Sequence, residues 1–334
     1  MQIENDFKNF PMGPKLAKWL RVDQSSVTDF DDSKKNQFLD FILRHIEDAA
    51  VDSEETLVDL IDELVSMDLP TAALKLADFQ ANIWTRKSFR GTQAEGIAAM
   101  IIGDLGRAEM CFKHAHHSAP EEPAPYTNLV QVLYHDDRIE DAEVWLNAGL
   151  NTNPNYYRLW ELVYALEQKK GHEQDAINKK VYELANDLSS WAGYSLASET
   201  DSNANSQTKA HNLSNFYASG ERDVEFLIEY TGALGAAGDL EKIPLIFWEA
   251  KKAAAGSELP WRLQMHAAQA YLSLGKHEDF IEQAKGILDI KYIPDEVKNY
   301  LLELVTEAEK ELTEAKEAKN KEKEKPDPNI SESN

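Results

Sequence analysis

The sequence predicts an all-α fold in which helical hairpins stack side by side. Three alanines, Ala108, Ala142 and Ala176, recur 34 residues apart, and a period in this range is typical of stacked supersecondary units. Within each unit apolar residues recur at three and four positions, which is helical spacing. Turn residues separate the two apolar runs of a unit. Each unit is therefore predicted to be a helix, a turn and a second helix.

Two further residue types repeat at the same interval. Pro120 and Pro154 lie 34 residues apart, and the aromatic residues Tyr126 and Trp160 precede Ala142 and Ala176 by 16 residues. Helix axes that pack about 8–10 Å apart leave little room for a branched side chain. The repeated alanine is thus expected where the two helices of a unit touch.

These residues resemble the tetratricopeptide repeat family, a 34-residue helical hairpin that stacks into a right-handed superhelix. The family usually presents a concave groove to a peptide or a partner protein. Units counted from Phe89, Pro123 and Tyr157 carry the following residues of the family pattern: Tyr126 and Trp160 at position four, Gly96 at eight, Ala108, Ala142 and Ala176 at twenty, Phe112 at twenty-four, Ala115 at twenty-seven, Pro120 and Pro154 at thirty-two. The sequence departs from the pattern at Thr92, Val130 and Leu188.

The resemblance implies a right-handed solenoid with divergent helical repeats on either side of three tetratricopeptide units. The segment that follows these units is rich in Ser, Asn, Gly and Thr, which favours a loop. The final residues lack the apolar surface needed to offset chain entropy. The predicted divisions are 1–33 (N-terminal segment, partly irregular), 34–88 (helical or degenerate repeat), 89–187 (three units), 188–222 (linker or long loop), 223–318 (C-terminal divergent helical repeats) and 319–334 (disordered tail).

If the family geometry applies, the first helix of each unit lines a concave groove. The groove is then predicted to mix amides, aliphatic side chains, an aromatic and few charges, which suits an extended peptide or a helix. The partner-binding residues predicted in this way are Gln93, Ile97, Met100, Thr127, Asn128, Gln131, Tyr134, Arg158, Glu161 and Gln168.

The family's clamp for C-terminal carboxylates is not expected in this groove. Asn128 matches one clamp position, and Arg158 keeps the charge of another. Gln93, Ile97 and Leu162 occupy the remaining three, so most of the positive charge is missing. Recognition of a terminal carboxylate depends on such charge-assisted hydrogen bonds.

The charge balance restricts the class of partner. The formal net charge is −24, which predicts no binding to nucleic acid and favours protein partners with basic patches. The longest apolar run, residues 96–103, is far shorter than the roughly 20 residues of a membrane-spanning helix, so no membrane insertion is expected. The first residues mix acids and prolines where a secretory signal needs an apolar core. A cytoplasmic location is therefore predicted, while the oligomeric state stays open.

The only cluster with ligand chemistry is Cys111, His114 and His117. A thiolate and imidazoles can bind zinc, but a structural zinc site takes four ligands, usually from two segments, and no second pair has ligand spacing. The favoured interpretation is a helix with a histidine-rich flank. His135 and Asp137 form an H-x-D pattern that is better explained as a solvated turn. We expect no metal and no cofactor.

Nucleotide-binding, metalloprotease and serine-hydrolase motifs are absent from the sequence, and no enzyme is predicted. The leading hypothesis is a scaffold or adaptor that binds a peptide or partner protein through the concave groove. An alternative is a regulator that senses a ligand or peptide, with residues 188–222 as the hinge between two helical lobes. A third hypothesis is an enzyme with an unrecognised site in the C-terminal part.

Overall fold

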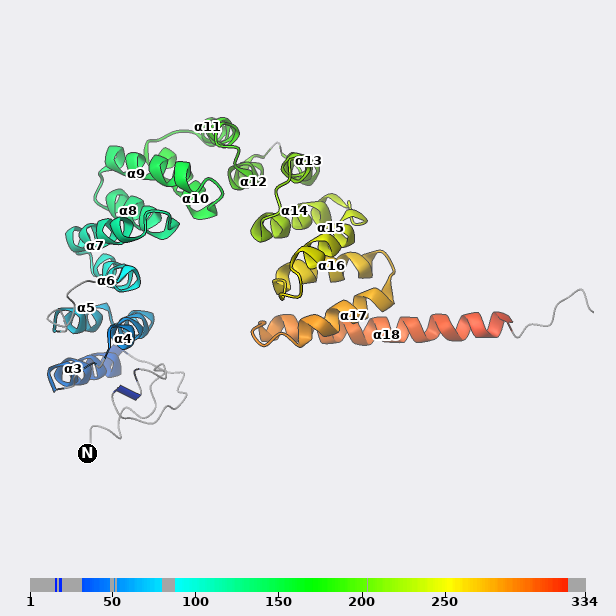
Figure 1. Ribbon diagram of the computed structural model, residues 1–334, viewed down its shortest axis with the longest axis horizontal. Helices are drawn as coiled ribbons and strands as arrows, with labels where there is room; N and C mark the ends of the chain where they lie inside the picture. The colour runs from blue at the N-terminus through cyan, green and yellow to red at the C-terminus, as the bar shows by residue number, and fades with distance from the viewer. Residues whose placement is uncertain are drawn as a thin grey trace, which may run out of the picture. The chain divides into compact units, whose positions relative to one another are not determined.

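The computed structural model describes residues 16, 18–19, 32–48, 51, 53–79, 88–202 and 204–323. Every regular element within these residues is an α-helix, which confirms the predicted fold class. The chain divides into two compact units, residues 1–189 and 190–334. In each unit, helices that are neighbours in sequence pack on one another (Figure 1).

From residue 32 on, the described part of the N-terminal unit contains the helices α3, α4 and α5, followed by three hairpins. Its elements are α3 (Asp32–Asp48), α4 (Glu54–Ser66), α5 (Pro70–Phe79), α6 (Phe89–Ile101), α7 (Leu105–Ser118), α8 (Pro123–His135), α9 (Ile139–Thr152), α10 (Tyr157–Lys169) and α11 (Gln174–Asp187). The first helix of each hairpin starts at Phe89, Pro123 or Tyr157, where the sequence repeat was counted to begin. The first predicted unit is therefore the α6–α7 hairpin, the second α8–α9 and the third α10–α11.

A glycine lets α6 and α7 pack closely. A Cβ atom on Gly96 would lie 2.6 Å from Cε1 of Phe112, whose ring is fully buried. Ala108 and Ala115, on the same helix as Phe112, are also fully buried. This contact explains why a small residue and an aromatic residue occur together in the first unit.

The repeated aromatic and proline residues form the same hydrogen bond twice. The hydroxyl of Tyr126 donates to the carbonyl of Pro120 at 2.9 Å, and Nε1 of Trp160 donates to the carbonyl of Pro154 at 2.7 Å. Each bond ties the first helix of a hairpin to the turn before it. The spacing seen in the sequence thus reflects one structural element used in two successive hairpins.

The third repeated alanine does not lie at a helix contact. Ala142 is fully buried, but Ala176 is exposed and Ile177 is buried in its place. Helices α7 and α9 start 34 residues apart, at Leu105 and Ile139, and the same interval would start α11 at residue 173. Helix α11 starts at Gln174, one residue later. One residue turns a helix surface by about 100°, so the alanine rotates away from the contact and the isoleucine rotates into it.

The C-terminal unit consists of three hairpins and a long final helix. Its elements are α12 (Trp191–Thr200), α13 (Ser206–Ala218), α14 (Val224–Ala237), α15 (Lys242–Ala253), α16 (Trp261–Ser273), α17 (His277–Leu288) and α18 (Asp295–Lys323). Phe280 of α17 is fully buried against residues of α16 and α18. This aromatic residue replaces the alanine of the family pattern and belongs to the core of the unit.

The prediction of a linker or long loop over residues 188–222 is wrong, because α12 and α13 lie in this segment. Its serine and asparagine residues cap helices: Ser190 accepts a hydrogen bond from the backbone of Gly193, and Asn205 accepts one from Thr208. Trp191 is buried and meets Phe226 edge to face. Small polar residues pack inside this region, so its composition resembled that of a loop. Hinge motion at this segment stays a prediction.

The final helix extends past the predicted start of the tail. Helix α18 ends at Lys323, so residues 319–323 are helical, while 324–334 lie outside the described residues. Most of the predicted N-terminal segment, 1–33, also lies outside them. No helix in the described part of the chain is both long and apolar enough to cross a membrane.

Candidate functional site

The predicted groove residues lie on the first helices of the three central hairpins, α6, α8 and α10. Gln93 and Thr127 are buried. The exposed residues are Arg158, Glu161 and Gln168, and those of intermediate exposure are Ile97, Met100, Asn128, Gln131 and Tyr134. The predicted set thus contains both surface residues and residues that belong to the packing.

Two of the predicted amides bind each other. Nδ2 of Asn128 donates to Oε1 of Gln93 at 2.9 Å, which joins α8 to α6. The hydroxyl of Thr127 donates to the backbone carbonyl of Ala124 at 2.9 Å. These bonds satisfy polar groups that would be costly to bury unpaired. Gln93 and Asn128 therefore link α6 to α8, while the Thr127 bond lies within α8.

Tyr134 lies at the C-terminal end of α8 in a small polar cluster. Nζ of Lys169 is 4.2 Å from the centre of the Tyr134 ring and donates to the Tyr134 carbonyl at 2.6 Å. It also pairs with Asp137 at 2.5 Å. This pair lowers the pKa of the Asp137 carboxyl, mainly through the hydrogen bond from Lys169. The H-x-D pattern thus begins at His135, the last residue of α8, and places Asp137 in the turn before α9.

Glu167 forms a buried hub at the junction of α10 and α11. Its side chain is 3% exposed and accepts hydrogen bonds from Lys180, His172 and Lys170. Burial acts to raise the pKa of Glu167, but the three bonds outweigh it and lower the pKa to about 2. Glu167 is therefore ionised and acts as a structural anchor.

The histidine-rich flank of α7 packs against aromatic rings. Cys111 is buried, while His114 and His117 are exposed. His116 lies between them, with ring centres 4.8 Å from Tyr126 and 5.1 Å from Trp145. Burial lowers the pKa of His116, and nearby His117 lowers it further. Among the described residues, no group of three or more His, Cys, Asp and Glu could hold a metal ion.

The C-terminal unit contains polar links among α12, α13 and α14 that were not predicted from the sequence. Lys209 of α13 pairs with Glu229 of α14 at 2.5 Å and with Glu199 of α12 at 2.7 Å. The Ser195 hydroxyl donates to the same Glu229 oxygen. Burial acts to raise the pKa of Glu229, but the hydrogen bonds from Lys209 and Ser195 dominate, and its pKa is lowered.

A second link joins α16 to α14. The hydroxyl of Thr231 is 2.7 Å from the carbonyl of Leu227 and 2.9 Å from Nδ1 of His266. Because the hydroxyl proton is directed at the carbonyl, we assign Nδ1 of His266 as the donor and Nε2 as the acceptor. Burial lowers the pKa of His266, as does the charge of Arg262, whereas Glu229 opposes them. His266 is therefore neutral near pH 7.

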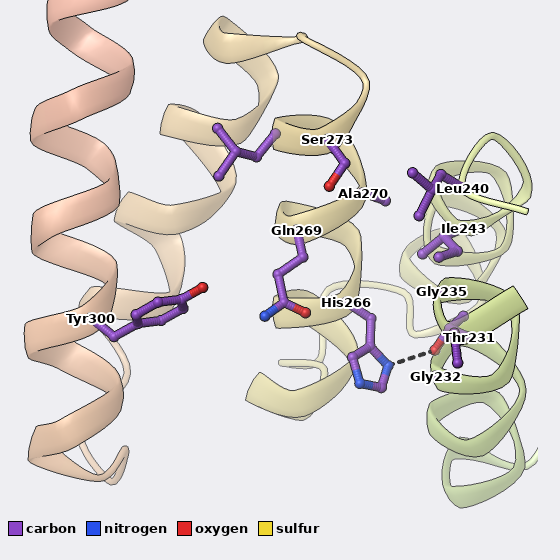
Figure 2. A pocket seen from close by; sticks show the side chains of 12 residues that line it. Thr231, Gly232, Gly235, Leu240, Ile243, His266, Gln269, Ala270, Ser273 and Tyr300 are labelled. Atoms are coloured by element: carbon purple, nitrogen blue, oxygen red, sulfur yellow. Dashed lines mark hydrogen bonds between the residues drawn. The ribbon is translucent and has the colours of Figure 1, made fainter. Parts of the chain in front are cut away.

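Two pockets meet at this histidine. One, of about 400 Å³, lies between α14 and α16 and reaches Tyr300 of α18; Figure 2 shows His266 in it, facing Thr231. The other, of about 550 Å³, is lined by α12, α13, α14 and α16 and includes Lys209 and Glu229. Gly232 and His266 line both pockets. The candidate site of this unit is therefore the face that α14 and α16 share.

One sequence signal could have revealed this site. The linking residue is the sixth residue of the first helix in three hairpins. It is Asn128 in α8, Glu229 in α14 and His266 in α16, counted from Pro123, Val224 and Trp261. Each bridges to the preceding first helix. The repeat is clear only in the three central hairpins, because the composition of residues 188–222 resembles that of a loop and hides the repeat there.

The stacked hairpins define the chain as a helical-repeat protein, and in this fold it resembles tetratricopeptide repeat proteins. No protein-family model matches it, and neither does any curated protein. Solved structures similar to it include MamA (19% identity, 43% of this chain and 86% of that chain, TM-score 0.35). A tetratricopeptide repeat protein from Parabacteroides merdae is 13% identical over 76% of this chain and 98% of that chain, with a TM-score of 0.37. A thermophilic tetratricopeptide repeat protein of Thermus thermophilus is 14% identical over 75% of this chain and 98% of that chain, with a TM-score of 0.29.

Proposed function

We propose that the protein is an interaction scaffold whose N-terminal unit binds a peptide or a partner protein along α6, α8 and α10. The observation that carries the proposal is a set of hydrogen-bonding side chains on α8 and α10: Gln131, Arg158, Glu161 and Gln168. None of them forms a hydrogen bond or ion pair within the described residues. Amides and a guanidinium of this kind suit the backbone and side chains of a bound segment.

Within this proposal the predicted residues divide into supporting residues and contact residues. Gln93, Asn128 and Thr127 each make a hydrogen bond within the unit, so in this proposal they support the surface. Ile97, Met100 and Tyr134 supply apolar contacts, while the four side chains on α8 and α10 supply polar ones. With a net charge of −24, the favoured partner carries a basic patch, and electrostatic steering speeds its association at low salt.

A comparison of matched variants tests this proposal. The tagged wild type, the Tyr134→Ala/Arg158→Ala variant and a Val144→Ala/Lys179→Ala control are used to capture proteins from native lysate, with mass spectrometry. The control residues are 67% and 78% exposed and lie on the second helices α9 and α11. We expect a stoichiometric partner that the control retains and the Tyr134/Arg158 variant loses.

Thermal melting followed by circular dichroism separates binding from folding. All three proteins should melt within a few degrees of one another, since the substituted side chains are exposed or of intermediate exposure. A partner captured equally by both variants would place the binding surface elsewhere and refute the groove.

A further inference from the structure

A further pocket of the C-terminal unit is separate from the two that meet at His266. It has a volume of about 440 Å³ and lies between the end of α13, the start of α14 and α15. None of the residues that line it also lines either of the other two pockets. Pockets that bind small molecules have volumes of about 300–1,000 Å³, so this one is large enough for a small ligand.

Apolar residues of α14 and α15 form most of the walls of this pocket. Alanines line it along the last turn of α15, where larger side chains would fill the space. An apolar ligand group is stabilised here by about 25 cal/mol for each Å² of surface that it removes from water. The apolar lining residues include Val224, Leu227, Ile246, Ala250, Ala253 and Leu259.

The polar residues of the pocket lie together around Tyr217. The Tyr217 hydroxyl donates to a carboxylate oxygen of Glu249 at 2.5 Å, and Cζ of Arg222 is 3.6 Å from the centre of the Tyr217 ring. Burial raises the pKa of Tyr217, and the bond to Glu249 raises it further, to about 12, although Arg222 opposes both. Tyr217 is therefore a neutral donor near pH 7, with an acid and a base beside it.

Arg222 and Glu249 keep hydrogen-bonding capacity for a ligand. Nη1 of Arg222 donates to the backbone carbonyls of Tyr217 and Glu221, each at 2.7 Å. Its Nε and Nη2 form no hydrogen bond, and neither Arg222 nor Glu249 forms an ion pair, with any residue that the structure describes. Both side chains are exposed. One positive and one negative group thus stand beside an apolar pocket.

We propose that this pocket binds a free α-amino acid with an apolar side chain, such as leucine. Its carboxylate pairs with Arg222, its ammonium group pairs with Glu249, and its side chain enters the space between α14 and α15. An α-amino acid matches the pocket because it carries both charges next to one apolar group. The site lies within the C-terminal unit and does not rest on the groove proposed for the N-terminal unit.

Leucine and its derivatives test the site on the full-length chain. Binding of L-leucine, L-alanine, N-acetyl-L-leucine, L-leucinamide and N-acetyl-L-leucinamide is followed by NMR chemical-shift changes. We expect L-leucine to bind, and L-alanine to bind at least about tenfold more weakly because it buries less apolar surface. N-acetyl-L-leucine and L-leucinamide should each bind about tenfold more weakly, since each loses one charge-assisted hydrogen bond. No binding of L-leucine would overturn the proposal. Equal binding of N-acetyl-L-leucinamide would also overturn it, in favour of an apolar side chain of a peptide.

Charge variants then assign each end of the ligand. Glu249→Gln should remove the preference for L-leucine over N-acetyl-L-leucine, and Arg222→Gln should remove the preference for L-leucine over L-leucinamide. Glu241→Gln and Lys251→Gln are matched controls, because both residues are exposed and neither lines the pocket. The controls should keep both preferences. Unchanged preferences in Glu249→Gln and Arg222→Gln would refute the two contacts.

A substitution that fills the pocket locates the apolar side chain of the ligand. Ala253 lines the pocket and is exposed, so Ala253→Leu should weaken L-leucine binding at least about tenfold while the melting temperature stays within a few degrees of the wild type. The Tyr134→Ala/Arg158→Ala variant should bind L-leucine as the wild type does. Full binding by Ala253→Leu, or loss of binding in the Tyr134/Arg158 variant, would refute this site without bearing on capture by the N-terminal groove.

Discussion

The two units join their first helices with different chemistry. In the N-terminal unit a neutral amide pair, Gln93 and Asn128, bridges α6 and α8. In the C-terminal unit the corresponding bridges contain an ionised carboxylate, Glu229, and an imidazole, His266. All three bridges use the sixth residue of the later helix. The same position can therefore carry either a neutral contact or one that contains a charged group.

This difference leaves the two units with different hydrogen-bonding groups at their helix junctions. The amide pair uses one N–H of Asn128 and the oxygen of Gln93 for the contact between α6 and α8. The imidazole of His266 uses one nitrogen for the packing bond, while its other nitrogen lies beside two pockets. Free hydrogen-bonding groups on a rigid helix face are what a ligand needs, and the C-terminal unit has them at its helix junctions.

The units also differ in how closely other atoms approach their glycines. A substitution at such a glycine is expected to have the largest effect on the free energy of unfolding. Gly96→Val should cost about 3 kcal/mol, near the upper end of typical overpacking, because its Cβ atom would lie 2.6 Å from the buried ring of Phe112. Gly235→Val should change stability by less than about 1 kcal/mol, since the nearest atom to its Cβ is 3.8 Å away. Urea denaturation of each variant measures both values.

Hydrogen exchange assigns the loss to a unit. Amides of α6 and α7 should lose protection in Gly96→Val, while those of α14 stay protected in Gly235→Val. Similar costs for the two substitutions would remove the contrast in packing between the units.

Replacement of Glu167, the buried hub of the N-terminal unit, is expected to have the second largest effect on the free energy of unfolding. Glu167→Gln should cost about 2 kcal/mol at pH 7, the scale of hydrogen bonds to a charged group, because it weakens the bonds from Lys170, His172 and Lys180. The pKa of Glu167 is lowered to about 2. Its stabilisation is therefore present above the unfolded pKa of about 4.3 and is lost as the pH falls toward 2.

Urea denaturation at a series of pH values checks both parts of this prediction. The difference between wild type and Glu167→Gln should shrink between pH 5 and pH 2. A difference that stays constant over this range would mean that the carboxylate charge does not stabilise the α10–α11 junction.

Loss of the neutral hydrogen bond between Asn128 and Gln93 is expected to lower the free energy of unfolding by a smaller amount, which does not depend on salt. Asn128→Ala leaves Oε1 of the buried Gln93 without its partner, which costs about 1 kcal/mol or somewhat more. Ser195→Ala should cost less, since Glu229 keeps its pair with Lys209. Denaturation in 0.05 and 1 M NaCl provides the measurement. Salt should leave the cost of Asn128→Ala unchanged, and a strong salt dependence would show that the bridge is not a neutral contact.

An exposed ion pair predicts the smallest effect. Lys316 and Glu278 link α18 to α17 at 3.0 Å, with side chains 61% and 71% exposed. Pairs of this kind contribute about 0–1 kcal/mol, so Lys316→Ala should lower the free energy of unfolding by about 0.5 kcal/mol or less. Chemical denaturation would detect a larger loss. Such a loss would show that the final helix depends on this pair rather than on the buried contacts of Leu301 and Val305.

Much of the fold could be read from local spacing. The helices α6, α8 and α10 start at Phe89, Pro123 and Tyr157, where the repeat was counted from sequence. The repeated aromatic and proline residues also had one structural cause, since Tyr126 and Trp160 each bind the carbonyl of the preceding proline. Interactions over six residues leave a pattern that recurs along the chain, so they are visible without tertiary structure.

The sequence by itself determined the helical hairpins, because helix spacing and close helix contacts depend on residue size and period. Only the tertiary structure decided which polar groups meet, such as Gln93 with Asn128 or Thr231 with His266. These partners are 35 residues apart, and their contact depends on how one helix is rotated against another. A shift of one residue rotates a side chain by about 100°, as the exposure of Ala176 shows. Composition cannot report that rotation, and for the same reason it hid α12 and α13.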